Sequence, residues 1–134
     1  MSMEFDLIAP HTLLESTAAG EAIDVGASAT RTFLCHMVIS DQIEQESLDV
    51  SIWGSADGQA WGTHPILKLP QRFYRGETRA VLELALRPEV KFIRAKWELN
   101  KWGRGAPVPA FRAGLHLAEI PAMPLPSALQ AVSR

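Results

Sequence analysis

The strongest constraint on the fold is an alternation of apolar and polar residues with a period of two. It runs through Arg31–Ser40, Ser47–Trp53, Thr78–Leu86, Lys91–Leu99 and Phe111–Ile120. Successive side chains of a β-strand point to opposite faces, so this period predicts strands that turn one face toward a core. Thr78–Leu86 also contains good helix formers. Its period and the Arg87-Pro88 pair that follows favour a strand over the alternative helix.

The segment Arg31–Ser40 is apolar on both of its faces, which predicts a central strand covered on both sides. Phe33, Cys35, Met37 and Ile39 share one face, and the other face includes Leu34 and Val38. Weaker patterns predict short strands at His11–Thr17 and Glu21–Val25, separated by an Ala19-Gly20 turn, and at Ile66–Leu69, ended by Pro70.

Glycine and proline punctuate these segments at short intervals, and no helical pattern follows each strand. The first observation is typical of a sandwich or barrel, and the second argues against a β-α-β fold. Half-apolar strands favour antiparallel pairing. We therefore predict a single all-β antiparallel sandwich over residues 1–120. Pro121, Pro124 and Pro126 break regular structure, so residues 121–134 are expected to form a proline-rich tail.

The composition excludes several classes of protein. The chain has 134 residues, a net charge of −2 and one cysteine, Cys35. No strong field favours nucleic acid, no intramolecular disulfide can form, and no apolar run is long enough to span a membrane. Cys35 is expected to be a buried, unreactive thiol. Met1–Asp6 does not resemble a signal peptide, so we expect a cytoplasmic protein or one assembled into a particle there.

The sequence contains no recognisable catalytic or metal-binding motif. His11, His36, His64 and His116 lack zinc-ligand spacing, and no nucleophile motif is present. We therefore predict no metal, no cofactor and no enzymatic activity. His36 and His116 can meet across a sheet. A cleft that held either one beside a carboxylate would favour an enzyme whose site assembles in space, and this alternative stays open.

A tight turn is expected at Ser55-Ala56-Asp57-Gly58-Gln59-Ala60-Trp61. Glycine accepts a positive φ angle, and the serine and aspartate side chains can cap free backbone N–H groups. We expect Trp61 to fold back over the hairpin. A calcium site is excluded because one carboxylate beside one serine supplies too few oxygens.

This turn, followed by Lys91-Phe92-Ile93-Arg94-Ala95, resembles the S-x-DG-x-x-W … (K/R)-(Y/F)-(I/V)-R pattern of discoidin-like domains, the coagulation-factor 5/8 C-terminal family. The resemblance covers Leu48–Leu99 and implies a jelly-roll β-sandwich that binds sugars, lipids or proteins through loops at one end. A similar phrase occurs in β-sandwich structural proteins of phages and prophages. The chain lacks the family's terminal cysteine pair, and no binding residue is carried over.

Binding residues are expected in loops where aromatic side chains lie beside arginines. Tryptophan, tyrosine and arginine are enriched at binding hot spots. The candidates are Arg72, Tyr74, Arg75, Trp102 and Arg104, with Met123 and Leu125 as apolar anchors of the tail on a neighbouring subunit. Arg94, Lys96 and Glu98 share one strand face, which is expected to be solvated and to form cross-strand ion pairs.

The predicted function is binding or assembly without catalysis, as a repeated subunit of a phage-like or other macromolecular particle. The expected partner is protein, including further copies of the chain, and neither nucleic acid nor membrane. The alternative is a carbohydrate- or small-ligand-binding module of discoidin-like type.

Overall fold

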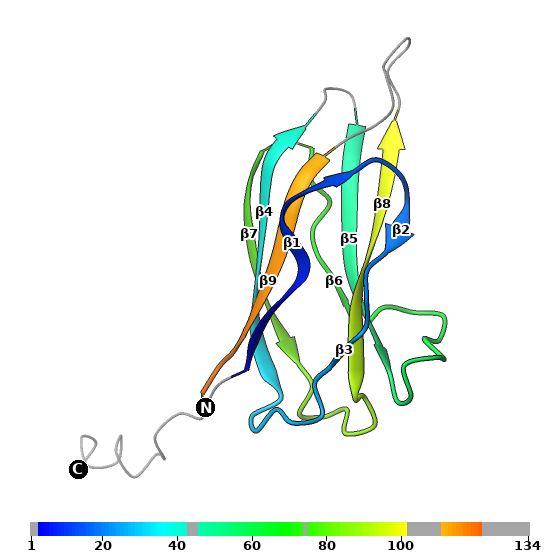
Figure 1. Ribbon diagram of the computed structural model, residues 1–134, viewed down its shortest axis with the longest axis vertical. Coiled ribbons are helices and arrows are strands. Elements are labelled where there is room, and N and C mark those ends of the chain that lie inside the picture. The colour runs from blue at the N-terminus through cyan, green and yellow to red at the C-terminus, as the bar shows by residue number, and fades with distance from the viewer. Residues whose placement is uncertain (1–2, 43–45, 74, 102–110, 122–134) are drawn as a thin grey trace, which may run out of the picture.

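A computed structural model describes residues 3–42, 46–73, 75–101 and 111–121. These residues form two antiparallel sheets packed against each other (Figure 1), so the predicted all-β sandwich is confirmed. The first sheet contains, in spatial order, β1 (Glu4–Leu14), β9 (Phe111–Glu119), β4 (Thr32–Gln42) and β7 (Gly76–Glu83). The second contains β2 (Ala18–Ala19), β8 (Phe92–Lys101), β5 (Glu46–Ser55) and β6 (Leu67–Lys68), while β3 (Ile23–Asp24) also pairs with β8.

The segments with clear alternation all form strands, and the strand predicted over Thr78–Leu86 is present, rather than a helix, but it ends at Glu83, so Leu84–Leu86 lie beyond β7. The N-terminal predictions are partly wrong. The strand expected at His11–Thr17 begins at Glu4 and ends at Leu14, because β1 pairs along β9 despite two register shifts that disrupt its alternation. Ala19 was expected in a turn but pairs with Lys96 as part of β2. Such a two-residue strand has too little pattern to detect.

The inner faces of the two sheets form one apolar core. Its fully enclosed side chains include Phe33, Met37, Leu48, Ile52, Ile93, Phe111, Leu115 and Leu117. Phe5 meets Phe33 edge-to-face, with ring centroids 5.7 Å apart. Burying a side chain of this size contributes about 1.5–3 kcal/mol. Cys35 is buried as predicted, and burial raises the pKa of its thiol to about 12.

The turn after β5 has the structural role expected for it. Ser55 Oγ accepts from the backbone N–H groups of Asp57 and Gly58, at 3.2 and 2.9 Å. Asp57 Oδ1 accepts from Gln59 and Ala60, at 2.8 and 3.0 Å. These backbone bonds, with that from Ala60 the strongest, lower the pKa of Asp57. Gly58 has a φ of 79°, which explains the glycine at this position.

Glu119, at the end of β9, links the start of β1 to the segment that precedes β4. Its Oε1 accepts from the Met3 backbone N–H at 2.8 Å, and its Oε2 accepts from Thr30 N–H and Ser28 Oγ at the same distance. These bonds, led by the one from the Thr30 backbone, lower the pKa of Glu119 to about 2. An ionised carboxylate thereby fixes the start of β1 and the segment before β4.

Candidate functional site

The outer face of the β1-β9-β4-β7 sheet is open to solvent in the described part of the chain. Leu34 on β4 is 39% exposed and Val81 on β7 is 53% exposed. The two residues are direct neighbours in the sheet register. The prediction that β4 is covered on both sides is therefore wrong: its neighbours β9 and β7 flank it within the sheet, but its second apolar face has no layer over it among the described residues.

Side chains on this outer face form rows across the strands. The first row, from β7 to β1, is Val81, Leu34, Ala118 and Glu4. The next row is Arg79, His36, His116 and Asp6, so the two histidines do meet across the sheet. A third row is Glu77, Val38 and Gly114. Within these rows the inner strands β9 and β4 carry small or apolar residues and the two histidines, while the edge strands β1 and β7 carry the charged residues and the exposed Val81.

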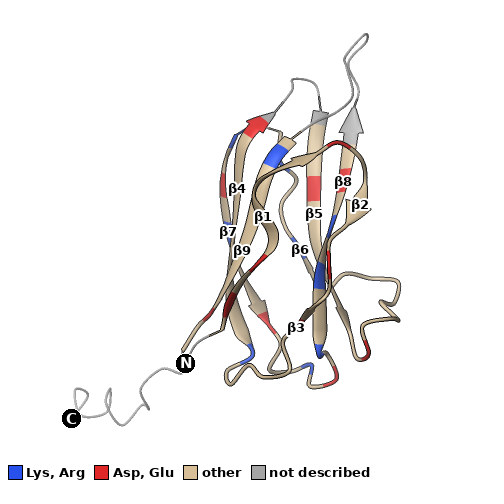
Figure 2. Cartoon of the chain, in the orientation of Figure 1, with Lys and Arg blue, Asp and Glu red and all other residues tan. Residues whose placement is uncertain are grey.

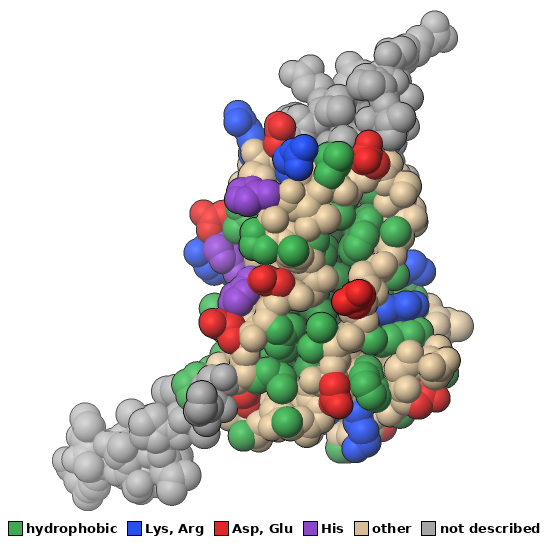
Figure 3. Space-filling model, viewed as in Figure 1, with side chains coloured by type: hydrophobic (Ala, Val, Ile, Leu, Met, Phe, Trp, Pro, Cys, Tyr) green, Lys and Arg blue, Asp and Glu red, His purple; other side chains and the backbone are tan. Residues whose placement is uncertain are grey.

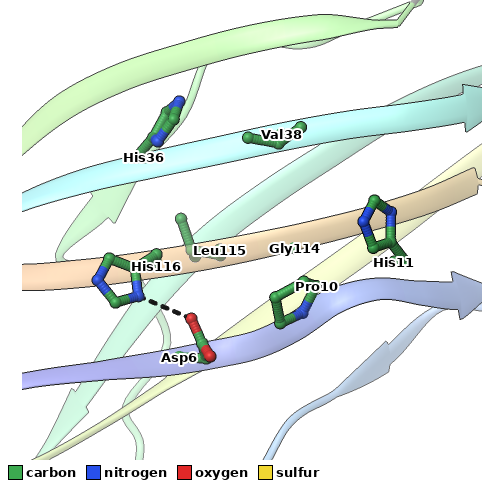
Figure 4. Close-up of a pocket in the computed structure, with 8 residues that line it drawn as sticks. All are labelled: Asp6, Pro10, His11, His36, Val38, Gly114, Leu115 and His116. Carbon is green, nitrogen blue, oxygen red and sulfur yellow. Dashed lines mark hydrogen bonds and ion pairs between the residues drawn. The ribbon is translucent and has the colours of Figure 1, made fainter.

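A shallow hollow of about 170 Å³ lies on this face between β1 and β4. It is lined by Asp6, Pro10, His11, His36, Val38, Gly114, Leu115 and His116 (Figure 4). The hollow forms where β1 departs from regular pairing, with His11 at a φ of 60°. Pro10 passes directly over Gly114, where a Cβ atom would lie 2.8 Å from the Pro10 Cα. Figure 3 shows histidine side chains gathered on this side of the molecule with acidic side chains beside them.

The histidines of the face are held by carboxylates. His116 Nδ1 lies 2.8 Å from Asp6 Oδ1, and its Nε2 lies 3.2 Å from Glu4 Oε2. The bond with Asp6, assisted by Glu4, raises the pKa of His116. His36 pairs with Glu77 through Nε2, and Arg79 contacts the same carboxylate at 3.3 Å.

This is the arrangement of histidine beside carboxylate that would favour an enzyme. Both ring nitrogens of His116 contact carboxylates, and His36 contacts Glu77 through Nε2, so the alternative of an enzyme site assembled in space stays open. His11 Nδ1 lies 3.0 Å from Ser40 Oγ, but that hydroxyl donates to the Arg112 carbonyl. Within the residues that the structure describes, no group of three or more histidine, cysteine or acidic side chains has metal-binding geometry.

The outer face of the other sheet differs from its prediction. Arg94 and Lys96 were expected to form cross-strand ion pairs, but Arg94 lies 4.4 Å from the ring centre of Trp61 and Lys96 lies 4.8 Å from that of Trp53. Trp61 therefore folds back as expected. The tryptophans supply cation–π contacts that sequence spacing does not reveal. Beside Trp53 a polar groove of about 300 Å³ includes Lys68, Lys96, Asp49 and Glu98 in its lining.

The predicted binding residues are only partly visible. Arg72 is half-buried and tied into its own loop: its Nε donates to Thr78 Oγ1 at 2.6 Å and its Nη2 to the Glu77 carbonyl at 3.0 Å. Arg75 is exposed. Tyr74, Trp102, Arg104, Met123 and Leu125 lie outside the described residues. Contact of this set with a partner stays a prediction.

Sequence reasoning found His36 and His116 but missed the residues around them. Asp6 and Pro10 lie in a strand whose bulges hide its pattern, and Gly114 was read only as an outward position in an alternating strand. The apolar second face of β4 was visible in the sequence. We predicted that another layer covers this face, because the sequence pattern of an apolar strand face is the same whether the face is covered or exposed.

The fold and this face define an all-β sandwich with an open, mixed apolar and charged sheet surface. No protein-family model matches the chain, and the comparison with curated proteins found no match. Charged residues of both signs are distributed over the described strands and loops (Figure 2). The described part of the chain contains no helix long and apolar enough to cross a membrane.

Proposed function

We propose that this protein is a non-enzymatic, repeated subunit of a macromolecular assembly and that it contacts its neighbour through the outer face of the β1-β9-β4-β7 sheet. The exposure of the adjacent Leu34 and Val81 carries this proposal. Interfaces combine apolar contact area with charged residues around it. On this face the apolar pair extends from the inner strand β4 to the edge strand β7, and charged residues of both edge strands lie in the same or the next rows. Contiguous exposed apolar residues on a folded protein often mark a site of contact with another protein.

The strand order supports a jelly-roll type for the sandwich. If β2 and β3 are counted as one interrupted strand, the two sheets read β1-β9-β4-β7 and β2/β3-β8-β5-β6. This is an eight-stranded order in which each sheet alternates early and late strands, as in a double Greek key. Jelly rolls recur in capsid and lectin domains, so the order agrees with the assembly proposal and with its alternative. The fold alone does not choose between them.

The test is the mass of the full chain in solution over a range of concentrations, measured by size-exclusion chromatography with light scattering. Leu34→Glu and Val81→Glu should each abolish association. Leu86→Glu is the matched control, because Leu86 is 88% exposed but lies beyond the end of β7. A strict monomer at high concentration, or a Leu86→Glu variant as impaired as the other two, overturns the proposal. Deleting residues 122–134 measures what the tail adds.

A second candidate function, carbohydrate binding, is favoured by the groove beside Trp53. An indole ring beside two lysines and two carboxylates offers a sugar both a stacking surface and charge-assisted hydrogen bonds. Lys96 lies over the same ring, so a sugar must displace it. A glycan array tests this candidate: binding that is lost in Trp53→Ala supports it. The absence of binding, or binding unchanged by that variant, removes it.

A further inference from the structure

We infer that the assembly contact is a two-fold pair, in which the outer β1-β9-β4-β7 faces of two copies pack against each other with their strands aligned. This inference rests on the proposed function and specifies its partner as a second copy of the chain. Two sheets packed face to face keep their strands within about 30° of each other. A two-fold axis parallel to the strands and midway between β4 and β9 satisfies that geometry and places β7 of each copy over β1 of the other.

The charge pattern of the face complements itself under this operation. The row Arg79, His36, His116 and Asp6 is positive at its β7 end and negative at its β1 end. The two-fold axis reverses the row, so Arg79 of each copy faces Asp6 of the other, and this contact occurs twice. Each side chain also has a partner within its own copy, Glu77 for Arg79 and His116 for Asp6, and each keeps exposed surface for a second contact, at 61% for Arg79 and 39% for Asp6. An isologous contact requires such reciprocal pairs.

The shape of the face agrees with its charge pattern. The same axis places β4 over β9, so Leu34 faces Ala118 of the second copy, a large side chain opposite a small one, as interdigitating layers require. Val38 faces the register position of Gly114, where the Pro10 backbone of the second copy covers the glycine. The hollow that Pro10 and Val38 help to line lies beside this contact.

The available area is sufficient for a specific contact. A face of four strands that are about 4.8 Å apart and about 27 Å long covers about 500 Å². Two such faces together bury about 1,000 Å² of surface, which is close to the lower limit for a specific protein–protein interface. The other acidic side chains of the face, Glu4, Glu77 and Glu83, lie on the edge strands. Each has a partner within its own copy: Glu4 contacts His116, Glu77 contacts His36, and Glu83 accepts a hydrogen bond from Thr32.

A charge exchange between two single variants tests the two-fold arrangement. Arg79→Asp brings two aspartates together at each contact, and Asp6→Arg brings two arginines together. Each variant alone should therefore associate at least about tenfold more weakly than the wild type. In an equimolar mixture, the introduced aspartate of one variant faces the introduced arginine of the other, and the unaltered Arg79 faces the unaltered Asp6. The mixture should associate as a heteropair, read by light scattering or by sedimentation of one labelled variant.

Each outcome separates this inference from the proposed function. Recovery of association in the mixture supports the two-fold pair. Association that depends on Leu34 but is not recovered in the mixture overturns the two-fold geometry and leaves the docking face standing. The absence of any self-association in the wild type overturns both. Circular dichroism melts of the two variants, within a few degrees of wild type, exclude misfolding as the cause of a loss. The double variant Arg79→Asp with Asp6→Arg repeats the test within one chain.

Discussion

Replacing Gly114 by alanine should destabilise the sandwich by forcing β1 away from β9. A Cβ atom at this position would lie 2.8 Å from Pro10 Cα, 3.2 Å from Pro10 N and 3.3 Å from the Ala9 carbonyl oxygen. Real Cβ atoms essentially never come closer than 3.0 Å to another heavy atom and ordinary contact begins at 3.4 Å, so the Pro10 backbone must move by at least 0.2 Å, and by 0.6 Å to reach ordinary contact. All three atoms belong to the backbone, so no side chain can rotate away.

The expected loss follows from two opposing effects. Overpacking of this kind costs about 1–3 kcal/mol. Alanine also restricts the unfolded chain more than glycine does, and this effect stabilises the folded state by about 0.4–1 kcal/mol. The difference of the two ranges is about 0–2.6 kcal/mol, and its centre near 1.3 kcal/mol corresponds to a melting temperature lowered by about 4–7 °C for a domain of this size. Urea unfolding followed by circular dichroism measures the free energy, and differential scanning calorimetry measures the melting temperature.

Gly26→Ala is the control for this substitution. Its Cβ would meet only Asp24 Oδ1, at 3.1 Å; that atom accepts a hydrogen bond from the Gly26 N–H at 2.8 Å, but it is the end of an exposed side chain and not backbone. We therefore expect a change within about 0.5 kcal/mol, as at most surface positions. If Gly114→Ala is as stable as wild type, Pro10 does not pass over Gly114 as the structure places it. The origin of the hollow given above would then be wrong.

Three further predictions concern ionisable groups. Asp6→Asn should lower the pKa of His116, measured by NMR titration of its ring protons, and an unchanged pKa would contradict the Asp6 contact. The pKa of His116 in the folded protein is raised above its ordinary value of 6.5. The contact with Asp6 therefore stabilises the fold below pH 6.5, and this stabilisation is lost as the pH rises through the folded pKa. Asp6→Asn should accordingly lower the melting temperature more at pH 6 than at pH 8.5. The folded pKa of Glu119 lies at about 2 against an ordinary 4.5, so its contribution is complete above pH 4.5 and is lost as the pH falls through about 2. Glu119→Gln should therefore melt below wild type at pH 6, with the two melting temperatures converging toward pH 2, and a constant difference would argue against an ionised Glu119 network. Cys35 should react with a thiol reagent at pH 8 only as fast as the chain opens, because burial raises its pKa to about 12, and fast reaction of the folded protein would refute this burial.

The fold could be predicted wherever a strand buries one face and exposes the other. In β9, Ala113, Leu115 and Leu117 are fully buried, and the residues between them point outward, so the period of two survives intact. β1 could not be predicted over its full length for the opposite reason. Its register shifts fall between Asp6 and Ile8 and between Ile8 and Thr12, and each shift interrupts the alternation. Pairing with β9, rather than its own pattern, keeps this segment extended.

The candidate site was predictable only in part, because its geometry depends on register. The sequence places His36 on the second face of a strand predicted to be covered on both sides, and His116 on the outward side of its strand, but only the pairing of β4 with β9 brings them opposite each other. Glu119 gave no signal, since an acidic residue that ends a strand is usually solvated. It becomes a structural group because Met3, Ser28 and Thr30 converge on it from distant parts of the chain.

An open face with this composition is hard to explain as an ordinary surface. A solvated sheet face is typically polar along every strand, as in half-buried antiparallel sheets. Here β4, a strand in the interior of its sheet, presents Leu34 and Val38 outward, while the arginine and the carboxylates lie on the edge strands β1 and β7. Apolar residues at the centre supply affinity when they are covered, and charges at the edges select the partner and its orientation. Because Arg79 and Asp6 occupy opposite ends of one row, the proposed two-fold pair would place each Arg79 opposite an Asp6 of the second copy.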